Sequence, residues 1–551
     1  MIRLFLLTLL ALPVLAADKP NVLLICVDDL KPILGCYGDT QIKSPNIDAL
    51  AKRSVLFESA YCNQAVCSPS RNSLMTSFRP QTLGIYDLGT NFRKTRPDAV
   101  TLAQAFKNSG YHTESLGKIF HVGHGNVDDE ASWSVPSYKA TVVGYALKEN
   151  MASKGLTREE ALFSNKPAKD LPKGAAYENS DVPDNAYGDG LLAEEAIKRL
   201  QAAAKKPEQP FFLGVGFVKP HLPFVAPKKY WDLYERASFK PADVQSPPEG
   251  APSYAPQFGG ELRNYKGIPE QGALPEDLQR TLIHGYYAAT SYMDAQLGRV
   301  LRTLDETGLS KNTIIVLWGD HGWHLGDHGI WCKHTNYQQA ARIPVMVSAP
   351  RIAAARSQSF IETVDIYPTL CELASVQAPS GLDGESFVPV LKDPTQKIRE
   401  HIIHVYPRND LLGRAIRTER YRLVEWKKIG ESADTAEFEL YDYQSDPDET
   451  KNLVKDQPEV VAQLRAILAT HPEAKPQFRA NAPKGEKAKP KQDRVAMFKS
   501  RDKDQDGKLT REEFLANQPD PDEAPKRFPK FDANQDSFLS QEEFVNSGKV
   551  K

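Results

Sequence analysis

The chain of 551 residues has little net charge, few cysteines and no long apolar segment after its first 17 residues. Its formal net charge is -2, so we expect no basic face and no binding of nucleic acid. After the N-terminus, no segment approaches the roughly 20 apolar residues of a transmembrane helix, and we expect no membrane span. Six cysteines are too few and too scattered for a fold held together by disulfides. They are Cys26, Cys36, Cys62, Cys67, Cys332 and Cys371.

The N-terminus has the pattern of a secretory signal peptide. A short positive end is followed by an apolar stretch from Leu4 to Leu15 and by the small residues Ala16-Ala17. The apolar stretch is too short for a stable membrane span. We therefore expect residues 1–17 to be cleaved and the mature protein to be exported, to the periplasm or the extracellular space.

Short β-branched apolar runs alternate with helix-like stretches, which is typical of an α/β protein with a largely parallel sheet. Three runs end in polar residues. They are Asn21 to Val27 before Asp28-Asp29, Phe211 to Val218 before Lys219-Pro220-His221, and Thr313 to Trp318 before Gly319-Asp320-His321. The reactive crevice of an open α/β sheet lies outside the carboxyl ends of its strands. Each polar pair alone could be a solvated turn or a helix cap, but the set predicts one site.

The pattern changes to short alternating segments between Arg399 and Thr470. We expect strands at 401–406, 420–425 and 438–441 and a helix at 458–468, forming a small antiparallel subdomain (399–470) beside a main domain (18–398). Residues 471–492 are rich in Pro, Lys, Ala and Asn with few large apolar residues, and we interpret them as a linker.

Residues 493–551 contain two loops with the ligand spacing of a calcium-binding EF-hand. The first loop also has glycine at its sixth position, Gly507. Its predicted ligands are Asp502, Asp504, Asp506, Lys508 and Glu513. The second loop repeats the spacing with Asp532, Asn534, Asp536 and Glu543.

The second loop should bind calcium more weakly, because Ser537 stands where glycine allows a positive φ. Leu509 and Leu539 fall at matching positions, where paired hands form a short β contact, so we expect one helical two-hand module. Exported modules of this kind bind calcium with dissociation constants of about 10⁻⁴ to 10⁻³ M. The alternative is an acidic, solvated tail.

The segment Cys67-Ser68-Pro69-Ser70-Arg71 precedes an amphipathic run. With Pro69 near its start, this run predicts a helix with Cys67 at the N-terminus, where free N–H groups and the dipole favour an anion. The alternative is an ordinary thiol, for example in a disulfide with Cys62.

With five further motifs, this segment makes residues 20 to about 470 resemble the formylglycine-dependent sulfatases, in the branch that contains iduronate-2-sulfatase. The motifs are Val27-Asp28-Asp29-Leu30, Leu34-Gly35-Cys36-Tyr37-Gly38, Gly117-Lys118-Ile119-Phe120-His121, Lys219-Pro220-His221-Leu222-Pro223-Phe224 and the ten residues from Asp320 to Gly329. The resemblance implies an alkaline-phosphatase-like fold, with a large, mostly parallel sheet between helices. It also implies a formylglycine made from Cys67 by a formylglycine-generating or sulfatase-maturating enzyme. Five cysteines then remain, and Cys26 is the one we expect to stay unpaired.

The resemblance also assigns the site residues. Asp28, Asp29, Asp320 and His321, with the formylglycine oxygen at position 67, would ligate one divalent cation, Ca²⁺ before Mg²⁺ because the ligands are mainly oxygens. Many arylsulfatases have Asn at the position of His321.

The catalytic roles follow from the same resemblance. Arg71 would hold the aldehyde hydrate, Lys118 and Lys333 would clamp the sulfate, His221 would protonate the leaving oxygen and His121 would accept a proton as sulfate is expelled. Lys333 could instead be a surface charge and His121 a packing histidine. We expect His324 and His334 to border the pocket and His328 to support its loop, rather than a zinc cluster.

The sequence thus predicts an exported sulfatase acting on a sulfated carbohydrate. The favoured substrate is a 2-O-sulfated uronic acid in a glycosaminoglycan or an algal polysaccharide. One alternative is a phosphatase or phosphodiesterase of the same superfamily. The other is a non-catalytic, calcium-binding surface protein.

Overall fold

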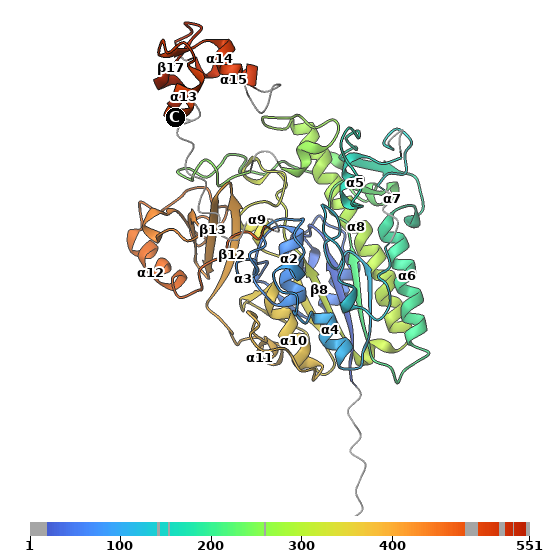
Figure 1. Cartoon of the computed structure of the whole chain (residues 1–551). Coiled ribbons are helices and arrows are strands. Elements are labelled where there is room, and N and C mark those ends of the chain that lie inside the picture. The colour runs from blue at the N-terminus through green and yellow to red at the C-terminus, as the bar shows by residue number, and fades with distance from the viewer. Residues whose placement is uncertain are drawn as a thin grey trace, which may run out of the picture. The chain divides into compact units, whose positions relative to one another are not determined.

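The computed structural model describes residues 19–139, 144–151, 155–257, 260–479, 494–516, 524–532 and 534–546 (Figure 1). The chain divides into two compact units, Met1–Phe478 and Arg479–Lys551. The predicted signal peptide lies outside the described residues, as do residues 480–492 of the predicted linker. None of the described helices is long and apolar enough to cross a membrane.

A seven-stranded sheet forms the centre of the first unit. Its order is β10 (Ala355–Ser357), β2 (Val55–Phe57), β9 (Val345–Ser348), β8 (Thr313–Gly319), β1 (Asn21–Val27), β6 (Phe211–Phe217) and β4 (His112–Gly117). All neighbouring pairs are parallel except those of β9 with β2 and β8. The predicted mostly parallel sheet is confirmed.

Helices cover both faces of this sheet, because alternate side chains of its central strands point to opposite sides. Val22 and Leu24 of β1 join a core with α2 (Cys67–Thr76), α4 (Leu102–Asn108) and α10 (Ile366–Leu373). Leu23 and Ile25 join a second core with α1 (Pro45–Ala51), α6 (Gly188–Ala203) and α8 (Glu276–Glu306). Figure 1 shows α2 and α4 on one side and α6 and α8 on the other.

Shorter elements complete this part of the unit. They are β3 (Ala60–Tyr61) with β11 (Ile361–Glu362), β5 (Tyr177–Ser180) with β7 (Phe224–Pro227), α3 (Pro80–Leu83), α5 (Arg158–Phe163), α7 (Lys228–Trp231), α9 (Gln338–Ala341) and α11 (Val388–Lys392).

The predicted C-terminal sheet is also confirmed. It is antiparallel, with the order β12 (His401–Arg408), β13 (Leu411–Thr418), β14 (Tyr421–Lys428) and β15 (Glu437–Asp442), and α12 (Pro458–Leu468) packs on it. The prediction missed β13, where Gly413 and Arg414 interrupt the apolar pattern. A Cβ at Gly413 would lie 2.6 Å from Asn336 Nδ2, so this strand needs glycine for close packing.

Residues 471–478, which the sequence assigned to the linker, belong to the first unit and hydrogen-bond to its α3 region. The Lys475 N–H donates to the Gln81 carbonyl (2.9 Å) and the Phe478 N–H donates to that of Gly84 (2.7 Å).

The second unit contains two helix–strand–helix segments. They comprise α13 (Arg494–Arg501), β16 (Lys508–Leu509), α14 (Arg511–Leu515), α15 (Ala524–Phe531), β17 (Leu539–Ser540) and α16 (Gln541–Asn546). β16 and β17 pair antiparallel, with Leu509 opposite Leu539. Both leucines are buried in a small core with four phenylalanines, Phe498, Phe514, Phe528 and Phe544.

Candidate active site

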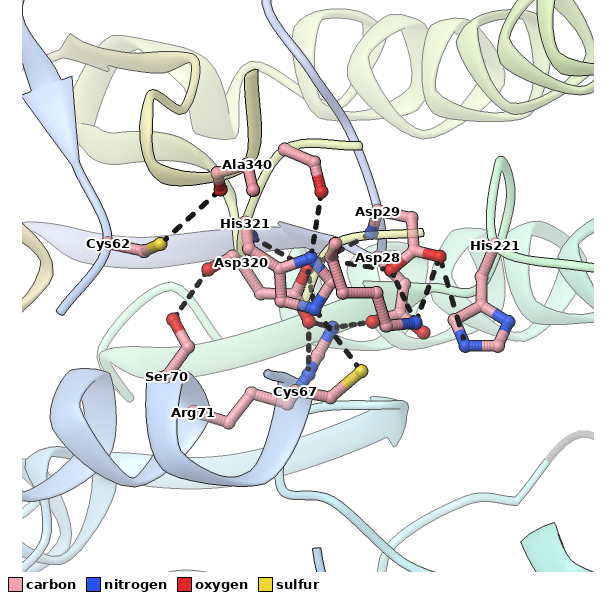
Figure 2. Close-up of polar contacts among 12 residues, drawn as sticks. Asp28, Asp29, Cys62, Cys67, Ser70, Arg71, His221, Asp320, His321 and Ala340 are labelled. Atoms are coloured by element: carbon pink, nitrogen blue, oxygen red, sulfur yellow. Dashed lines mark hydrogen bonds and ion pairs between the residues drawn. The ribbon is translucent and has the colours of Figure 1, made fainter. Parts of the chain in front are cut away.

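The register of the central strands brings the predicted site residues to one edge of the sheet. Val27, the last residue of β1, lies opposite Phe217 of β6 and Gly319 of β8. Asp28-Asp29 therefore emerges beside Asp320-His321 (Figure 2). These four side chains are completely buried. The Asp29 N–H donates to Asp320 Oδ1 (3.0 Å), which ties the two strand ends together.

Cys67 is the first residue of α2, as predicted from the sequence, and every residue of this helix is buried. Its sulfur lies 3.3 Å from His321 Nε2 and 3.7 Å from Lys118 Nζ. All six cysteines are unpaired, so Cys62 and Cys67 do not form the disulfide that was the alternative. Burial, reinforced by Asp28, raises the pKa of the Cys67 thiol. An unmodified thiol here would be a weak nucleophile, because the thiolate is the reactive form.

Four of the five predicted ligands of the catalytic cation form a suitable binding group. Asp28, Asp29, Cys67 and His321 offer ligand atoms that all lie within 4.8 Å of one another. Asp29 Oδ1 is buried and accepts no hydrogen bond in the described part of the chain, although Lys333 Nζ lies 3.1 Å away. Two buried carboxylates, of which Asp29 has an oxygen that accepts no hydrogen bond from the described residues, fit a hard divalent cation.

Asp320 lies beside this group with its oxygens already engaged. Its Oδ1 accepts the N–H groups of Asp29 and His321, both at 3.0 Å, and its Oδ2 accepts Arg71 Nε at 3.0 Å. Burial raises the pKa of Asp320 to about 6 and Asp28 adds to the rise, while His321 and Arg71 oppose it.

Arg71 connects the acidic groups. It is completely buried, and its Nη2 donates to Asp28 Oδ1 (3.1 Å), in addition to the Asp320 contact (Figure 2). Nη1 donates to the carbonyls of Lys118 and Ile119. The sequence assigned Arg71 to the aldehyde hydrate, whereas its hydrogen bonds in the described residues go to these four groups.

Both predicted sulfate clamps lie next to Cys67 and the carboxylates. Lys118 Nζ contacts Asp28 Oδ2, and Lys333 Nζ lies 3.1 Å from Asp29 Oδ1. Lys333 is only 2% exposed, so it is not the surface charge that the sequence left open.

His221 and His121 have opposite electrostatic environments. Burial lowers the pKa of His221, but Asp29 and Glu261 more than offset this and raise it to about 10. Burial, Lys118 and His124 hold the pKa of His121 well below its usual value. At neutral pH, His221 can donate a proton and His121 can accept one.

Sequence reasoning missed two side chains. Glu261 bridges His221 Nε2 (3.0 Å) and Lys333 Nζ (2.5 Å), and His124 Nδ1 lies 3.2 Å from His121 Nε2. Glu261 is the first residue of a short 3-10 helix (Glu261–Asn264) that follows an irregular segment. No motif or hydrophobic periodicity surrounds it, so nothing in the sequence indicated that it belongs to the site.

A pocket of about 480 Å³ opens onto Cys67. His121, His221, Lys333 and His334 line it, as predicted for His334. Contrary to expectation, His324 does not; its Nε2 bonds to Thr335 Oγ1 (2.9 Å). His328 Nε2 bonds to the Asp448 carbonyl (2.8 Å).

The second unit holds the other predicted ligands. Asp502, Asp504 and Glu513 offer oxygens within 4.8 Å of one another. Asp502 accepts the N–H groups of Asp506 (3.1 Å) and Gly507 (3.0 Å).

The described residues of the second loop make a similar set of hydrogen bonds. Asp532 accepts the N–H groups of Asp536 (3.1 Å) and Ser537 (3.0 Å), and Asn534 Nδ2 donates to Asp536 Oδ2 (3.1 Å). The Asn534 N–H donates to Glu543 Oε1 (3.3 Å). Ser537 has a φ of 70°, which is unfavourable for a side chain with a Cβ.

A mostly parallel sheet with buried carboxylates, an imidazole and a helix-borne cysteine at its carboxyl edge defines an alkaline-phosphatase-like hydrolase. The chain belongs to the sulfatase family, whose sequence profile matches residues 20–376. A second profile, described as N-sulphoglucosamine sulphohydrolase, C-terminal, matches residues 326–473. The protein is therefore a sulfuric ester hydrolase. Its family depends on formylglycine and uses a divalent metal.

A curated relative supports the family assignment, and two solved structures share the fold. The chain is 34% identical to iduronate 2-sulfatase of Mus musculus over 518 residues, covering 80% of this chain and 92% of that protein. In fold it is similar to a phosphonate monoester hydrolase from Silicibacter pomeroyi, with a TM-score of 0.66 and 22% identity over 82% of this chain and 95% of that one. A structure described in complex with its substrate D-glucosamine-2-N,6-O-disulfate has a TM-score of 0.63 and 20% identity, covering 85% of this chain and 100% of that one.

Proposed function

We propose that this protein is an exported sulfatase that removes sulfate from a sulfated carbohydrate. The proposed substrate is a 2-O-sulfated uronic acid in a glycosaminoglycan or an algal polysaccharide, by analogy with the iduronate 2-sulfatase at 34% identity. The observation that carries the proposal is the position of Cys67, at the start of α2 and 3.3 Å from His321, with the two lysines beside it.

Each residue has a role that its surroundings support. A formylglycine hydrate at position 67 supplies one hydroxyl to attack sulfur and a second whose deprotonation expels sulfate. Lys118 and Lys333 hold the sulfate oxygens as negative charge spreads. His221 protonates the sugar oxygen when its bond to sulfur breaks, and His121 takes the proton of the second hydroxyl.

The metal in this proposal is Ca²⁺, with Mg²⁺ as the alternative. Asp28, Asp29, Asp320 and His321 would hold it together with the formylglycine oxygen at position 67. It would polarise the sulfate oxygens and lower the pKa of the attacking hydroxyl.

The test combines mass spectrometry with sulfate release. Protein produced with a maturating enzyme should yield a peptide, Ser54 to Arg71, that is about 18 Da lighter than the thiol form, since CH₂SH becomes CHO. This protein should release sulfate from a uronate 2-sulfate, and Cys67→Ala should not. Faster hydrolysis of phosphate esters than of sulfate esters would favour the phosphatase alternative. Desulfation by native protein that retains the thiol would refute the mechanism.

We further propose that residues 493–551 form a pair of EF-hands that bind calcium structurally. The gathering of Asp502, Asp504 and Glu513 supports this, as does the pairing of Leu509 with Leu539. Under this proposal the first unit carries out the catalysis. In the alternative, a non-catalytic calcium-binding surface protein, residues 493–551 would carry the function.

A further inference from the structure

The pocket at Cys67 contains one arginine that the proposed chemistry does not use. Arg158, the first residue of α5, lines the pocket together with Cys67, His221 and Lys333. Its side chain is half-buried, and its Nη1 donates a hydrogen bond to Asn264 Oδ1 (3.0 Å). A guanidinium carries five N–H donors in a rigid plane, so most of this side chain's donors are available to a ligand.

The other cationic groups of the pocket wall are already paired or neutral. Lys333 contacts Asp29 and Glu261, and His221 contacts Glu261. Burial lowers the pKa of His124 to about 4 and that of His334 to about 3, so both imidazoles are neutral at pH 7.

The adjacent carboxylate does not pair with Arg158. Glu159 Oε2 accepts the Gly174 N–H (3.3 Å), and burial raises the pKa of this side chain although the charge of Arg158 partly opposes the rise. Among the described residues, Arg158 is thus the cation of this pocket that forms no ion pair with a carboxylate. A partly desolvated guanidinium is stabilised by an anion, and its planar fork matches a carboxylate.

We propose that Arg158 binds the carboxylate of the sugar and thereby determines specificity for uronic acids. This inference rests on the proposed function. The sulfate is held by Lys118, Lys333 and the metal group, so a substrate with a second anion needs a second cation in the same pocket. Arg158 supplies that cation, and Asn264 fixes its orientation.

The test uses two sulfated disaccharides that differ at one group. One carries a 2-O-sulfated uronic acid, and in the other the carboxylate is reduced to a primary alcohol. Hydrogen bonds to charged groups contribute about 1.5 to 3 kcal/mol, so Arg158→Gln should raise KM for the acid about 10- to 100-fold with little change in kcat. The same variant should change kcat/KM for the reduced substrate less than about twofold.

Binding provides a second readout that does not depend on turnover. Calorimetry with the desulfated uronate disaccharide should show the same 10- to 100-fold loss of affinity in Arg158→Gln, and partial recovery in Arg158→Lys. The control variant is Lys173→Gln, which removes an exposed positive charge. Lys173 Nζ donates to the carbonyl of Arg263 (3.3 Å), the residue before Asn264, and this variant should behave as wild type in both assays.

Three outcomes overturn the inference. Equal losses on both disaccharides mean that Arg158 acts only through the local fold. A wild-type enzyme that desulfates both equally well has no carboxylate site, although the proposed function stands. No sulfate release from either disaccharide by protein with verified formylglycine refutes the proposed substrate class and the inference with it.

Discussion

Removing Arg71 should destabilise the first unit, because this side chain neutralises two buried carboxylates. In Arg71→Ala, Asp28 keeps Lys118, but Asp320 keeps only His321, whose Nε2 is 3.6 Å from Oδ1. Breaking a buried ion pair costs about 3–5 kcal/mol. Unfolding entropy of about 2.1 cal/mol/K per residue gives roughly 1 kcal/mol/K for this unit, so the melting temperature should fall by about 3–5 °C.

Differential scanning calorimetry of wild type, Arg71→Ala and a control variant measures this effect. The control is Arg53→Ala, which removes an exposed pair with Asp305 (2.7 Å) and should shift the melting temperature by about 1 °C or less. In an Asp320→Asn background, Arg71→Ala should cost about half as much, because one of the two charges is gone. Bound calcium should also reduce the loss.

The loss should depend on pH in a defined direction. Burial already raises the pKa of Asp320 to about 6, and Arg71 lowers it. Without Arg71 this pKa rises further, so at pH 5.5 Asp320 is protonated and no charge is left unpaired. The penalty should therefore be larger at pH 8 than at pH 5.5. A melting temperature within about 1 °C of wild type at pH 8, or equal losses with and without Asp320→Asn, would refute this reasoning.

Two further predictions concern His221, the proposed proton donor, and the C-terminal residues 493–551. Glu261→Gln removes a carboxylate that raises the pKa of His221, so the loss of kcat on the alkaline side should begin at lower pH than in wild type; an unchanged pH profile contradicts this role. Deleting residues 493–551 should leave kcat/KM for sulfate release within about twofold of wild type. Calorimetry should show that the same deletion removes the calcium binding with a dissociation constant of about 10⁻⁴ to 10⁻³ M. Loss of sulfate release would show that the tail takes part in catalysis.

The predicted site residues that the structure brings to one edge of the sheet share a simple origin. Asp28, Asp320 and His221 each follow a strand of the parallel sheet, and strands in register end at the same edge. Cys67 was predictable as the start of a helix because Pro69 stands in the first turn. The expected amphipathic face is absent, since every residue of α2 is buried. Local pattern and the rule for strand ends were enough for these positions.

Other parts of the site depend on contacts between distant segments. Glu261 reaches His221 from an irregular loop, and Arg158 reaches the same pocket from α5. Arg71 illustrates the same limit, since the sequence placed it one turn after Cys67 but not between two carboxylates that lie 43 and 249 residues away.

The sequence by itself determined the alternation of strands and helices, the polar residues at the strand ends and the segment at Cys67, because each depends on neighbours along the chain. Only the tertiary structure decided which charges pair, which histidines are neutral and which cation remains for a ligand. Those properties depend on burial and on distances across the sheet, and residues far apart in the chain set both.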